Sequence, residues 1–365
     1  MSKSKLNVIV IFGGQSGEHE VSVVSANSVV NSLEISRYNI YTIGITKNGC
    51  WYWGVKPSEW INSSEKIEKH HVQVTVMLDP QKARFVSING SDLPNEGSCD
   101  VIFPVLHGPK GEDGTIQGLF EMVGFPYVGS GVLGGSLGMD KDRMKAVFLQ
   151  EGLPLLPYLT VLRSELNKNK DDIVNKISSV LGYPCFIKPA NLGSSVGISK
   201  ADNKLELADA LEFAAKYDKK LVIEKGIKGR EIELSVLGND DVIVSIPGEI
   251  IPSNDFYDYE AKYKSNDSKL IIPAKLNTEL IKLLQSYAKK VFKAVDARGL
   301  GRIDFFVTSN GSIYVNEINT MPGFTEISMY PKLWQASGIE YSELLNKLIQ
   351  LGMENYQDNK NREIN

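Results

Sequence analysis

Asp304 and Glu317 are spaced so that a β-hairpin would bring their carboxylates face to face. The stretch GRIDFFVTSNGSIYVNEIN, residues 301–319, has apolar residues on both sides of Asn310-Gly311. An Asn-Gly pair between such segments favours a type I′ turn of two residues. That turn places Asp304 directly opposite Glu317. Two facing carboxylates repel each other, so a divalent cation between them is one way for a sheet to keep the pair.

Arg302 and Asn319 extend this predicted face of the hairpin. The same register pairs Arg302 with Asn319, and the two-residue period of a strand puts both on the face of Asp304 and Glu317. Carboxylate and amide oxygens are the hard ligands that Mg²⁺ or Mn²⁺ prefers. A solvated face with Asp304 paired to Arg302 or another neighbour is the alternative. The amide two residues beyond Glu317 and the nearby arginine favour the metal.

A lysine followed by a glycine- and serine-rich loop is a candidate phosphate site. In KPANLGSSVG, residues 188–197, Lys188 ends a predicted strand, and Ser194 and Ser195 lie in the loop. Backbone N–H groups of such a loop bind phosphate oxygens while the lysine adds positive charge. The motif differs from a Walker A loop because the lysine comes first. An ordinary hairpin turn is the alternative, since glycine and serine suit both.

Glu224 and Glu231 lie on either side of a glycine-containing hinge after the apolar strand LVIE. An extended backbone with a carboxylate suits an adenine edge, and a second carboxylate suits ribose hydroxyls. The residues alone favour the simpler interpretation, two exposed surface glutamates.

Four cations form a phosphate clamp if the fold brings them together, although each alone is typical of a solvated side chain. They are Lys141, Lys188, Lys262 and Arg302. The tyrosine-rich loop at about residues 252–267 contains Lys262 and Tyr263. This loop is either a lid that excludes water or an ordinary surface loop.

The opening stretch IFGGQSGEHEVS, residues 11–22, resembles a phosphate loop but lacks the GxGxxG spacing of a dinucleotide site. Glu18 follows a predicted parallel strand, and His107 follows another. Ligands of open α/β sheets bind at the carboxyl ends of strands, so both side chains are predicted to line a substrate pocket. For His107 alone, a structural loop histidine is the simpler interpretation.

The elements that must position these residues alternate between strands and helices. Continuous apolar runs predict buried parallel strands at residues 6–12, 41–45 and 101–106, and helical spacing predicts helices at 25–33 and 116–123. The fold class is therefore α/β, beginning with an open parallel domain. We expect three domains: residues 1–138, residues 139–226, and residues 227–365 with the hairpin and the lid loop.

The bulk composition excludes several classes of protein. Lys and Arg total 40 against 44 Asp and Glu, for a formal charge of −4 in 365 residues. With no block dense in basic residues, we expect no nucleic acid and no membrane as partners. The three cysteines lack metal or disulfide spacing and indicate a reduced, cytoplasmic protein. The apolar run near the first residue is interpreted as a strand and not as a signal peptide.

Seven segments in order resemble the D-alanine:D-alanine ligase family of the ATP-grasp superfamily, over nearly the whole chain. They are GGQSGEHEVS, HGPKGEDGTIQG, KPANLGSSVG, EKGIKGRE, DFYDYEAKY, GRIDFF and VNEINTMPGFTEIS. The resemblance implies a three-domain ATP-grasp architecture and ATP-dependent joining of two D-alanines through an acyl phosphate. The dipeptide would serve synthesis of peptidoglycan precursors, in a cytoplasmic homodimer whose small-molecule partners are D-alanine and ATP.

The resemblance also implies roles for individual residues. Asp304, Glu317 and Asn319 would hold two Mg²⁺ (or Mn²⁺) ions. ATP would be bound by Lys141, Lys188, Ser194, Ser195, Glu224, Lys225, Ile227, Glu231 and Lys262. Arg302 and the backbone of Gly323 would stabilise the tetrahedral oxyanion. The two D-alanines would be held by Glu18, His107, Arg302, Ser328 and Met329, and a hydrogen-bonded link of Tyr263, Ser194 and Glu18 would close the lid.

Other functions are compatible with parts of the pattern. A related ligase that takes D-lactate, D-serine or another acceptor is the nearest; by the resemblance, Tyr263 and Met329 favour D-alanine. A nicotinamide-dependent oxidoreductase would leave Asp304 and Glu317 without a task. A non-catalytic nucleotide-binding regulator would be expected to have lost Arg302, Lys262 or a metal ligand, and all are present.

Overall fold

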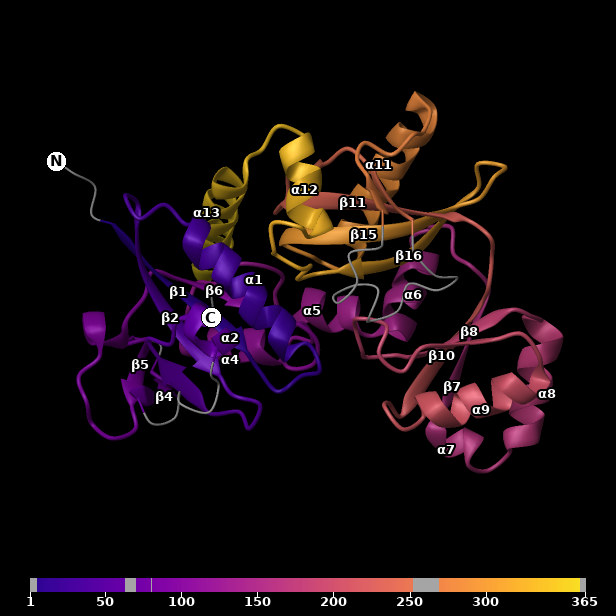
Figure 1. Ribbon diagram of the computed structural model, residues 1–365, viewed down its shortest axis with the longest axis horizontal. Coiled ribbons are helices and arrows are strands. Elements are labelled where there is room, and N and C mark those ends of the chain that lie inside the picture. The colour runs from indigo at the N-terminus through magenta and orange to yellow at the C-terminus, as the bar shows by residue number, and fades with distance from the viewer. Residues whose placement is uncertain (1–4, 63–69, 80, 252–268, 362–365) are drawn as a thin grey trace.

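The computed structural model describes residues 5–62, 70–79, 81–251 and 269–361. The described chain forms three β-sheets that follow one another in sequence (Figure 1). Lys262, Tyr263 and the whole of the expected lid loop lie outside these residues. Among the described helices, none is both long and apolar enough to cross a membrane.

The first sheet has the strand order β5-β4-β3-β2-β1-β6. Its strands are β1 (Leu6–Gly13), β2 (Tyr38–Ile45), β3 (Trp51–Trp53), β4 (Val72–Met77), β5 (Arg84–Ser87) and β6 (Val101–Val105). β1 pairs in parallel with β2 and β6, and β3 to β5 continue the sheet in antiparallel pairs. The parallel half agrees with the prediction from the apolar runs. The antiparallel half was not predicted, because its strands are short and only partly buried.

Helices cover this first sheet, and one of them begins earlier than predicted. They are α1 (His19–Ser32), α2 (Pro57–Asn62), the 3-10 helix η2 (Pro94–Gly97) and α4 (Thr115–Val123). The sequence predicted α1 only from Ser25, because the valines at 21 and 23 alternate as in a strand. Both valines are buried, and Val23 shares a core with the first sheet, so tertiary packing determines the helix here.

The second sheet is small and antiparallel, with the strand order β7-β10-β8-β9. It comprises β7 (Tyr158–Leu162), β8 (Cys185–Pro189), β9 (Ser199–Ala201) and β10 (Lys220–Lys225), with helices α7 (Arg163–Leu166), α8 (Lys170–Val180) and α9 (Lys204–Ala214). Its helices pack on one face to form a separate core.

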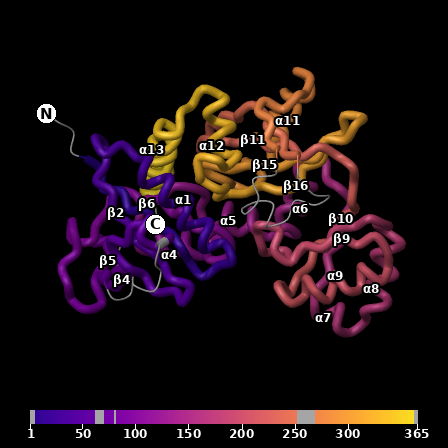
Figure 2. Tube along the Cα trace, viewed as in Figure 1, coloured from indigo at the N-terminus to yellow at the C-terminus, as the bar shows by residue number. Residues whose placement is uncertain are grey.

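The third sheet has the strand order β14-β13-β11-β15-β16, with β12 paired to β11. Its strands are β11 (Arg230–Gly238), β12 (Ile243–Val244), β13 (Gly248–Ile251), β14 (Lys269–Ile271), β15 (Gly299–Val307) and β16 (Ile313–Asn319). Helix α11 (Thr278–Ala294) packs on it. In the chain trace, α6 lies between the second sheet and strand β16 of the third sheet (Figure 2).

Helices outside the three sheets connect the modules. They are α5 (Val132–Met139), α6 (Lys141–Gln150), α12 (Met329–Ala336) and α13 (Tyr341–Lys360). Met144 and Phe148 of α6 share a core with the third sheet. Leu344 and Leu348 of α13 share a core with the first sheet, although they come last in the chain (Figure 1). The expected boundaries at 138/139 and 226/227 remain a proposal, with α6 and α13 packing across them.

The hairpin of β15 and β16 has the predicted register where it matters, but not the predicted turn. Arg302 pairs with Asn319 and Asp304 with Glu317. Beyond them the register shifts, and the turn is a three-residue loop closed by Thr308 and Ser312, with φ of +83° at Gly311 only. The predicted type I′ turn is therefore wrong. The loop has one residue more than predicted, and a β-bulge between the loop and Asp304 compensates for it. The pairing of Asp304 with Glu317 is therefore the same as predicted.

Candidate active site

The metal-site prediction concerns one face of the third sheet, and the structure brings its four residues together. Arg302 donates from Nε to Asp304 Oδ1 at 2.8 Å and from Nη2 to Oδ2 at 2.7 Å. Asn319 Nδ2 donates to Asp304 Oδ2 at 3.1 Å. Glu233, on the neighbouring strand β11, lies 3.0 Å from Arg302 Nε. The pairing of Asp304 with Arg302 was the alternative interpretation, but the face is largely buried and not solvated.

The side-chain oxygen atoms on this face are suited to bind a hard divalent cation. Asp304 and Glu317 face each other across the strands, and the orientation of Asn319 Nδ2 toward Asp304 leaves its carbonyl oxygen to act as a ligand. Within the described ranges no cluster of three or more His, Cys, Asp or Glu side chains is arranged for a metal. A site here would therefore depend on two carboxylates and one amide, as the sequence predicted.

Arg302 is held as a cation by its carboxylate neighbours. Burial disfavours its charge, but Asp304 and Glu233 raise the pKa of Arg302 well above its usual value. A fixed positive charge beside the facing carboxylates is suited to stabilising negative charge that develops on a substrate.

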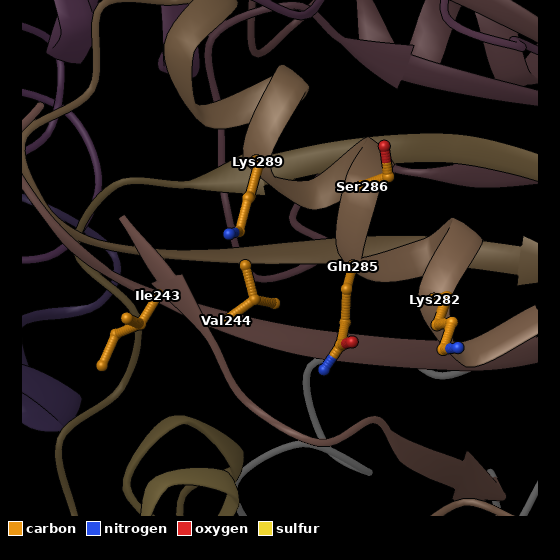
Figure 3. A pocket seen from close by; sticks show the side chains of 6 residues that line it. All are labelled: Ile243, Val244, Lys282, Gln285, Ser286 and Lys289. Atoms are coloured by element: carbon orange, nitrogen blue, oxygen red, sulfur yellow. The ribbon is translucent and has the colours of Figure 1, made fainter. Parts of the chain in front are cut away.

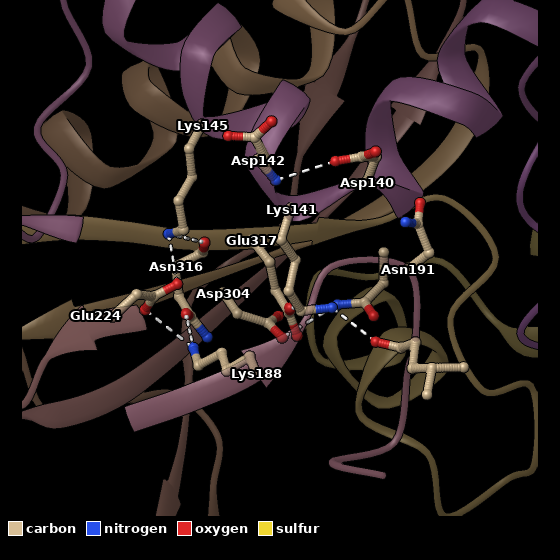
Figure 4. Close-up of polar contacts among 12 residues, drawn as sticks. Asp140, Lys141, Asp142, Lys145, Lys188, Asn191, Glu224, Asp304, Asn316 and Glu317 are labelled. Atoms are coloured by element: carbon tan, nitrogen blue, oxygen red, sulfur yellow. Dashed lines mark hydrogen bonds and ion pairs between the residues drawn. The ribbon is translucent and has the colours of Figure 1, made fainter. Parts of the chain in front are cut away.

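A second polar cluster joins the second sheet to strand β16 (Figure 4). Lys188 Nζ contacts Glu224 Oε2 at 2.9 Å and Asn316 Oδ1 at 3.3 Å. On the other side of the same carboxylate, Lys145 Nζ lies 3.0 Å from Glu224 Oε1. Glu224 is only 3% exposed, so the interpretation of a surface glutamate is wrong for this residue.

Glu224 is ionised in this cluster. Its burial alone would raise the pKa, but Lys145 and Lys188 lower the pKa of Glu224 to about 2. Burial likewise disfavours the charge of Lys188, yet Glu224 and Glu317 raise its pKa. The second and third modules thus share a buried network of fixed charges.

Lys141 reaches the same place from the first residue of α6. Its backbone N–H donates to Ala190 O at 2.9 Å and its Nζ to Leu192 O at 2.7 Å, so it lies along the Gly/Ser loop. The Nζ is 3.6 Å from Glu317 Oε2. Lys141 and Lys188 therefore converge on β16, as the clamp requires (Figure 4).

The Gly/Ser loop also touches the first module. Ser194 Oγ donates a hydrogen bond to Glu18 Oε1. Both Ser194 and Ser195 have positive φ, 49° and 59°, a conformation that turns successive backbone N–H groups to one side. A Cβ atom at Gly193 would come within 3.0 Å of Glu18 Oε2, so the loop lies against this carboxylate. Two members of the predicted Tyr263–Ser194–Glu18 link are thus in contact.

His107 is buried behind Glu18 at the end of β6. Its Nδ1 lies 3.1 Å from Met321 O and its Nε2 3.3 Å from Ser25 Oγ. Burial lowers the pKa of His107, which favours the neutral ring at neutral pH. These contacts are compatible with a structural histidine as well as with one that orients a substrate carboxylate.

Glu112 is a titratable group at this site that the sequence interpretation passed over. Its Oε2 accepts a hydrogen bond from Gly108 N at 2.6 Å. Burial, followed by the charge of Glu18, raises the pKa of Glu112 to about 8. The signal available in the sequence was its position in HGPKGEDG, five residues after His107.

Lys145, Asn316 and Glu233 were also missed. Lys145 lies one helical turn after Lys141, which is the spacing of residues on the same face of a helix. That spacing could have indicated a second inward lysine. Asn316 and Glu233 could not be found without knowing the bulge in β16 and the pairing of β11 with β15.

The remaining predicted residues lie at two ends of the site. Glu231 is half-buried at the start of β11, just beyond Lys225 and Ile227, and it contributes to raising the pKa of Lys188. At the other end, a Cβ atom on Gly323 would be 3.0 Å from Ser328 Oγ. The Met329 side chain packs in a small apolar cluster, so its backbone N–H is the group available at the start of α12.

A shallow groove elsewhere contains none of these residues. It lies between α11 and β12 and is lined by Ile243, Val244, Lys282, Gln285, Ser286 and Lys289 (Figure 3).

Comparisons with known proteins agree on one group of relatives. A family model described as the D-ala D-ala ligase N-terminus matches residues 7–130, and one described as the D-ala D-ala ligase C-terminus matches residues 147–350. A D-alanine--D-alanine ligase of Heliobacterium modesticaldum is 51% identical over 97% of this chain and 96% of the relative.

Solved structures give the same group. The D-alanine-D-alanine ligase from Coxiella burnetii is 35% identical, with a TM-score of 0.84 over 98% of this chain and 96% of that chain. The VanG D-Ala:D-Ser ligase from Enterococcus faecalis is 38% identical, with a TM-score of 0.85 over 96% of this chain and 100% of that chain.

Proposed function

The chain belongs to the D-alanine–D-alanine ligase family, and we propose that it joins two D-alanines to D-alanyl-D-alanine while ATP is converted to ADP and phosphate. It has the ATP-grasp fold of that family, as the resemblance implied. The observation that carries the proposal is the convergence of Lys141 and Lys188 on strand β16 beside Glu317. Cations and carboxylates from two modules meet there, as phosphoryl transfer to a carboxylate requires.

On the nucleotide side, Glu224 and the backbone from Lys225 to Ile227 hold adenine, and Glu231 holds the ribose. Lys141, Lys188 and the N–H groups at Ser194 and Ser195 hold phosphate oxygens, and Lys262 is proposed for the γ-phosphate. The support is the positive φ of both serines and the placement of both described lysines against the loop and β16. This arrangement positions the γ-phosphoryl group for transfer, and no protein side chain forms a covalent bond to it.

Asp304, Glu317 and Asn319 would hold two Mg²⁺ or Mn²⁺ ions. When bound, such ions neutralise charge on the β- and γ-phosphate oxygens during transfer. What the chain itself supplies is the fixed orientation of the ligands, since Arg302 fixes both oxygens of Asp304.

At the reacting carbon, the amine of the second D-alanine attacks the acyl phosphate of the first, and phosphate leaves. Arg302 and the backbone N–H of Gly323 stabilise the oxyanion of the tetrahedral intermediate. The charges of Asp304 and Glu233 keep Arg302 protonated, so Arg302 can donate hydrogen bonds throughout the pH range in which the enzyme is active.

The first D-alanine is held through its ammonium group by Glu18 and its carboxylate near His107. Glu18 supports this role because it is a buried carboxylate, 7% exposed, that accepts a hydrogen bond from the Ser194 hydroxyl of the second module. The second D-alanine places its carboxylate at Ser328 and the backbone of Met329, where helix α12 begins and its first N–H groups need acceptors. Tyr263 closes the link from Ser194 and Glu18 over both substrates.

The direct test is release of phosphate from ATP and Mg²⁺ with D-alanine, L-alanine, D-lactate or D-serine added. D-Alanine alone should give the fastest release together with the dipeptide. Release that does not depend on D-alanine would overturn the proposal, and faster release with D-alanine plus D-lactate or D-serine would assign a different acceptor. Glu317→Gln should raise the Mg²⁺ concentration needed for half-maximal turnover about tenfold or more.

We also propose that the enzyme is a cytoplasmic homodimer that supplies the dipeptide for peptidoglycan precursors. The support is the family itself and the three cysteines, which the described structure leaves unbridged. Sedimentation at micromolar concentration should give twice the mass of the 365-residue chain; a monomer there would exclude the dimer.

A further inference from the structure

Lys145 is a buried lysine that lies between the nucleotide side and the metal side of the site. Its side chain is 1% exposed, against 9% for Lys141 and 11% for Lys188, so Lys145 is the least accessible of the three lysines. Its Nζ contacts Glu224 Oε1 of β10 at 3.0 Å and the backbone oxygen of Asn316 in β16 at 3.1 Å. The residue itself comes from α6, whose core is shared with the third sheet.

The contact with β16 falls on the β-bulge. The register passes from Asp304 opposite Glu317 to Phe305 opposite Val315, so Asn316 is the extra residue. The extra residue of a bulge leaves the ladder, and its backbone groups need other partners. Lys145 Nζ donates a hydrogen bond to the backbone carbonyl oxygen of Asn316, and Lys188 Nζ donates one to the Asn316 side-chain oxygen. The bulge that sets the register of Glu317 is thus anchored by the two lysines that hold Glu224.

We propose that Lys145 is a positioning residue that couples nucleotide binding to metal binding, by fixing Glu224 and the bulged strand β16 to a single ammonium group. This inference rests on the proposed function, in which Glu224 contacts adenine and Glu317 contacts the metal. Without Lys145, the buried Glu224 carboxylate keeps Lys188 as its cation, which draws that lysine away from phosphate. The carbonyl of Asn316 loses its donor at the same time, and the position of the next residue, Glu317, is released.

Direct binding tests this inference without turnover. Binding of ADP to Lys145→Met, measured by calorimetry at saturating Mg²⁺, should be about tenfold weaker than for the unmodified chain. Mg²⁺ should increase the affinity for ADP, and the Mg²⁺ concentration at which half of this increase is reached should rise several-fold in the same variant. Lys145→Arg, which keeps the positive charge, should recover part of both effects.

The matched control is Phe148→Leu on the same helix. Phe148 is fully buried in the core with the third sheet, so this change loosens α6 without touching Glu224 or Asn316. It should lower the unfolding temperature and leave both binding measurements within about twofold. If Lys145→Met does not fold, the same measurements on Lys145→Gln, which keeps a hydrogen-bond donor without the charge, decide the question.

Two results would overturn the inference: unchanged ADP and Mg²⁺ binding in the Lys145 variants, or equal shifts in Phe148→Leu. Either would make Lys145 a purely structural lysine. These outcomes are separable from failure of the proposed function, because an unmodified chain that binds Mg²⁺-ADP but releases no phosphate with D-alanine contradicts the function alone.

Discussion

Individual residues in this site act in opposed pairs. The Glu18 carboxylate lies beyond the end of strand β1 in the first sheet. It accepts a hydrogen bond there from the hydroxyl of Ser194, which belongs to another module. Glu224 is the corresponding carboxylate on the proposed nucleotide side, and its charge is balanced by Lys145 and Lys188. The two carboxylates are therefore proposed to bind different substrates. A substitution of one should affect the binding of its own substrate and leave the binding of the other largely unchanged.

Glu18→Gln should weaken the use of D-alanine far more than the binding of ATP. In the proposed role, the substitution removes the charge opposite the substrate ammonium, and it keeps an acceptor for Ser194 Oγ. We expect the KM for D-alanine to rise about tenfold or more, because a buried charge pair loses one partner. The measurement is steady-state kinetics with each substrate varied in turn. Equal losses for D-alanine and ATP would contradict the assignment.

Glu112 should make stability depend on pH. Its pKa is raised to about 8, so the folded state binds this proton more tightly than the unfolded chain does. The stabilisation is complete below the ordinary carboxyl pKa and is lost as the pH rises through about 8. Between pH 5 and pH 8 the free energy of unfolding should fall by on the order of 1–3 kcal/mol more in the unmodified chain than in Glu112→Gln. Urea titrations of both proteins at several pH values check this, and parallel pH profiles would refute it.

At the scale of elements, the hairpin of β15 and β16 shows how far sequence reasoning reached. The alternation of side chains and the Asn310-Gly311 pair predicted which residues face each other at the site, and the structure agrees for Asp304 and Glu317. The turn type was wrong, because a three-residue loop and a bulge give the same register as a two-residue turn. Local propensity does not distinguish these solutions; the contacts of Asn316 with two distant lysines do.

Other parts of the site were predictable to different degrees. Motifs and strand ends singled out Lys188 and Glu18 as candidates, and the resemblance added Lys141. The antiparallel strands β3 to β5 were not predicted, because they are short. Helix α1 was placed too late, since its valines favour a strand until the sheet beneath them is known. Long-range packing, and not composition, decided each of these differences.

Gly311→Ala tests the observed turn. Gly311 has φ of +83°, a conformation that alanine adopts only with strain, and the space around it is open. The free energy of unfolding should fall by about 1 kcal/mol. Thermal or urea unfolding measures this, with Ser309→Ala in the same loop as the control. Turnover should change little, because the bulge and the carboxylates lie at the far end of the strands; a large loss of turnover would contradict this.

At the scale of the whole molecule, the last helix completes the first module. Leu344 and Leu348 of α13 are fully buried in the same core as Val8 and Phe103 of the first sheet. The described chain therefore closes on itself, and the C-terminal segment belongs to the third module in sequence but to the first in packing (Figure 1).

Leu348→Ala should destabilise the first and third modules together. Removing a fully buried leucine leaves a cavity and costs about 2–5 kcal/mol. Denaturant unfolding followed by tryptophan fluorescence would report on the first module through Trp51, Trp53 and Trp60. Lys347→Ala, at a partly exposed position of the same helix, is the matched control and should change stability by less than about 0.5 kcal/mol. An unaltered midpoint in Leu348→Ala would mean that α13 does not stabilise this core.

The position of α13 has a consequence for synthesis of the chain on the ribosome. Strands β1 and β6 are finished by Val105, but the helix that covers part of their apolar face begins only at Tyr341. At ordinary translation rates the interval is on the order of tens of seconds. During that time the nascent first module lacks the cover that α13 gives to part of its apolar face in the folded chain, and this exposed surface favours aggregation and binding by chaperones.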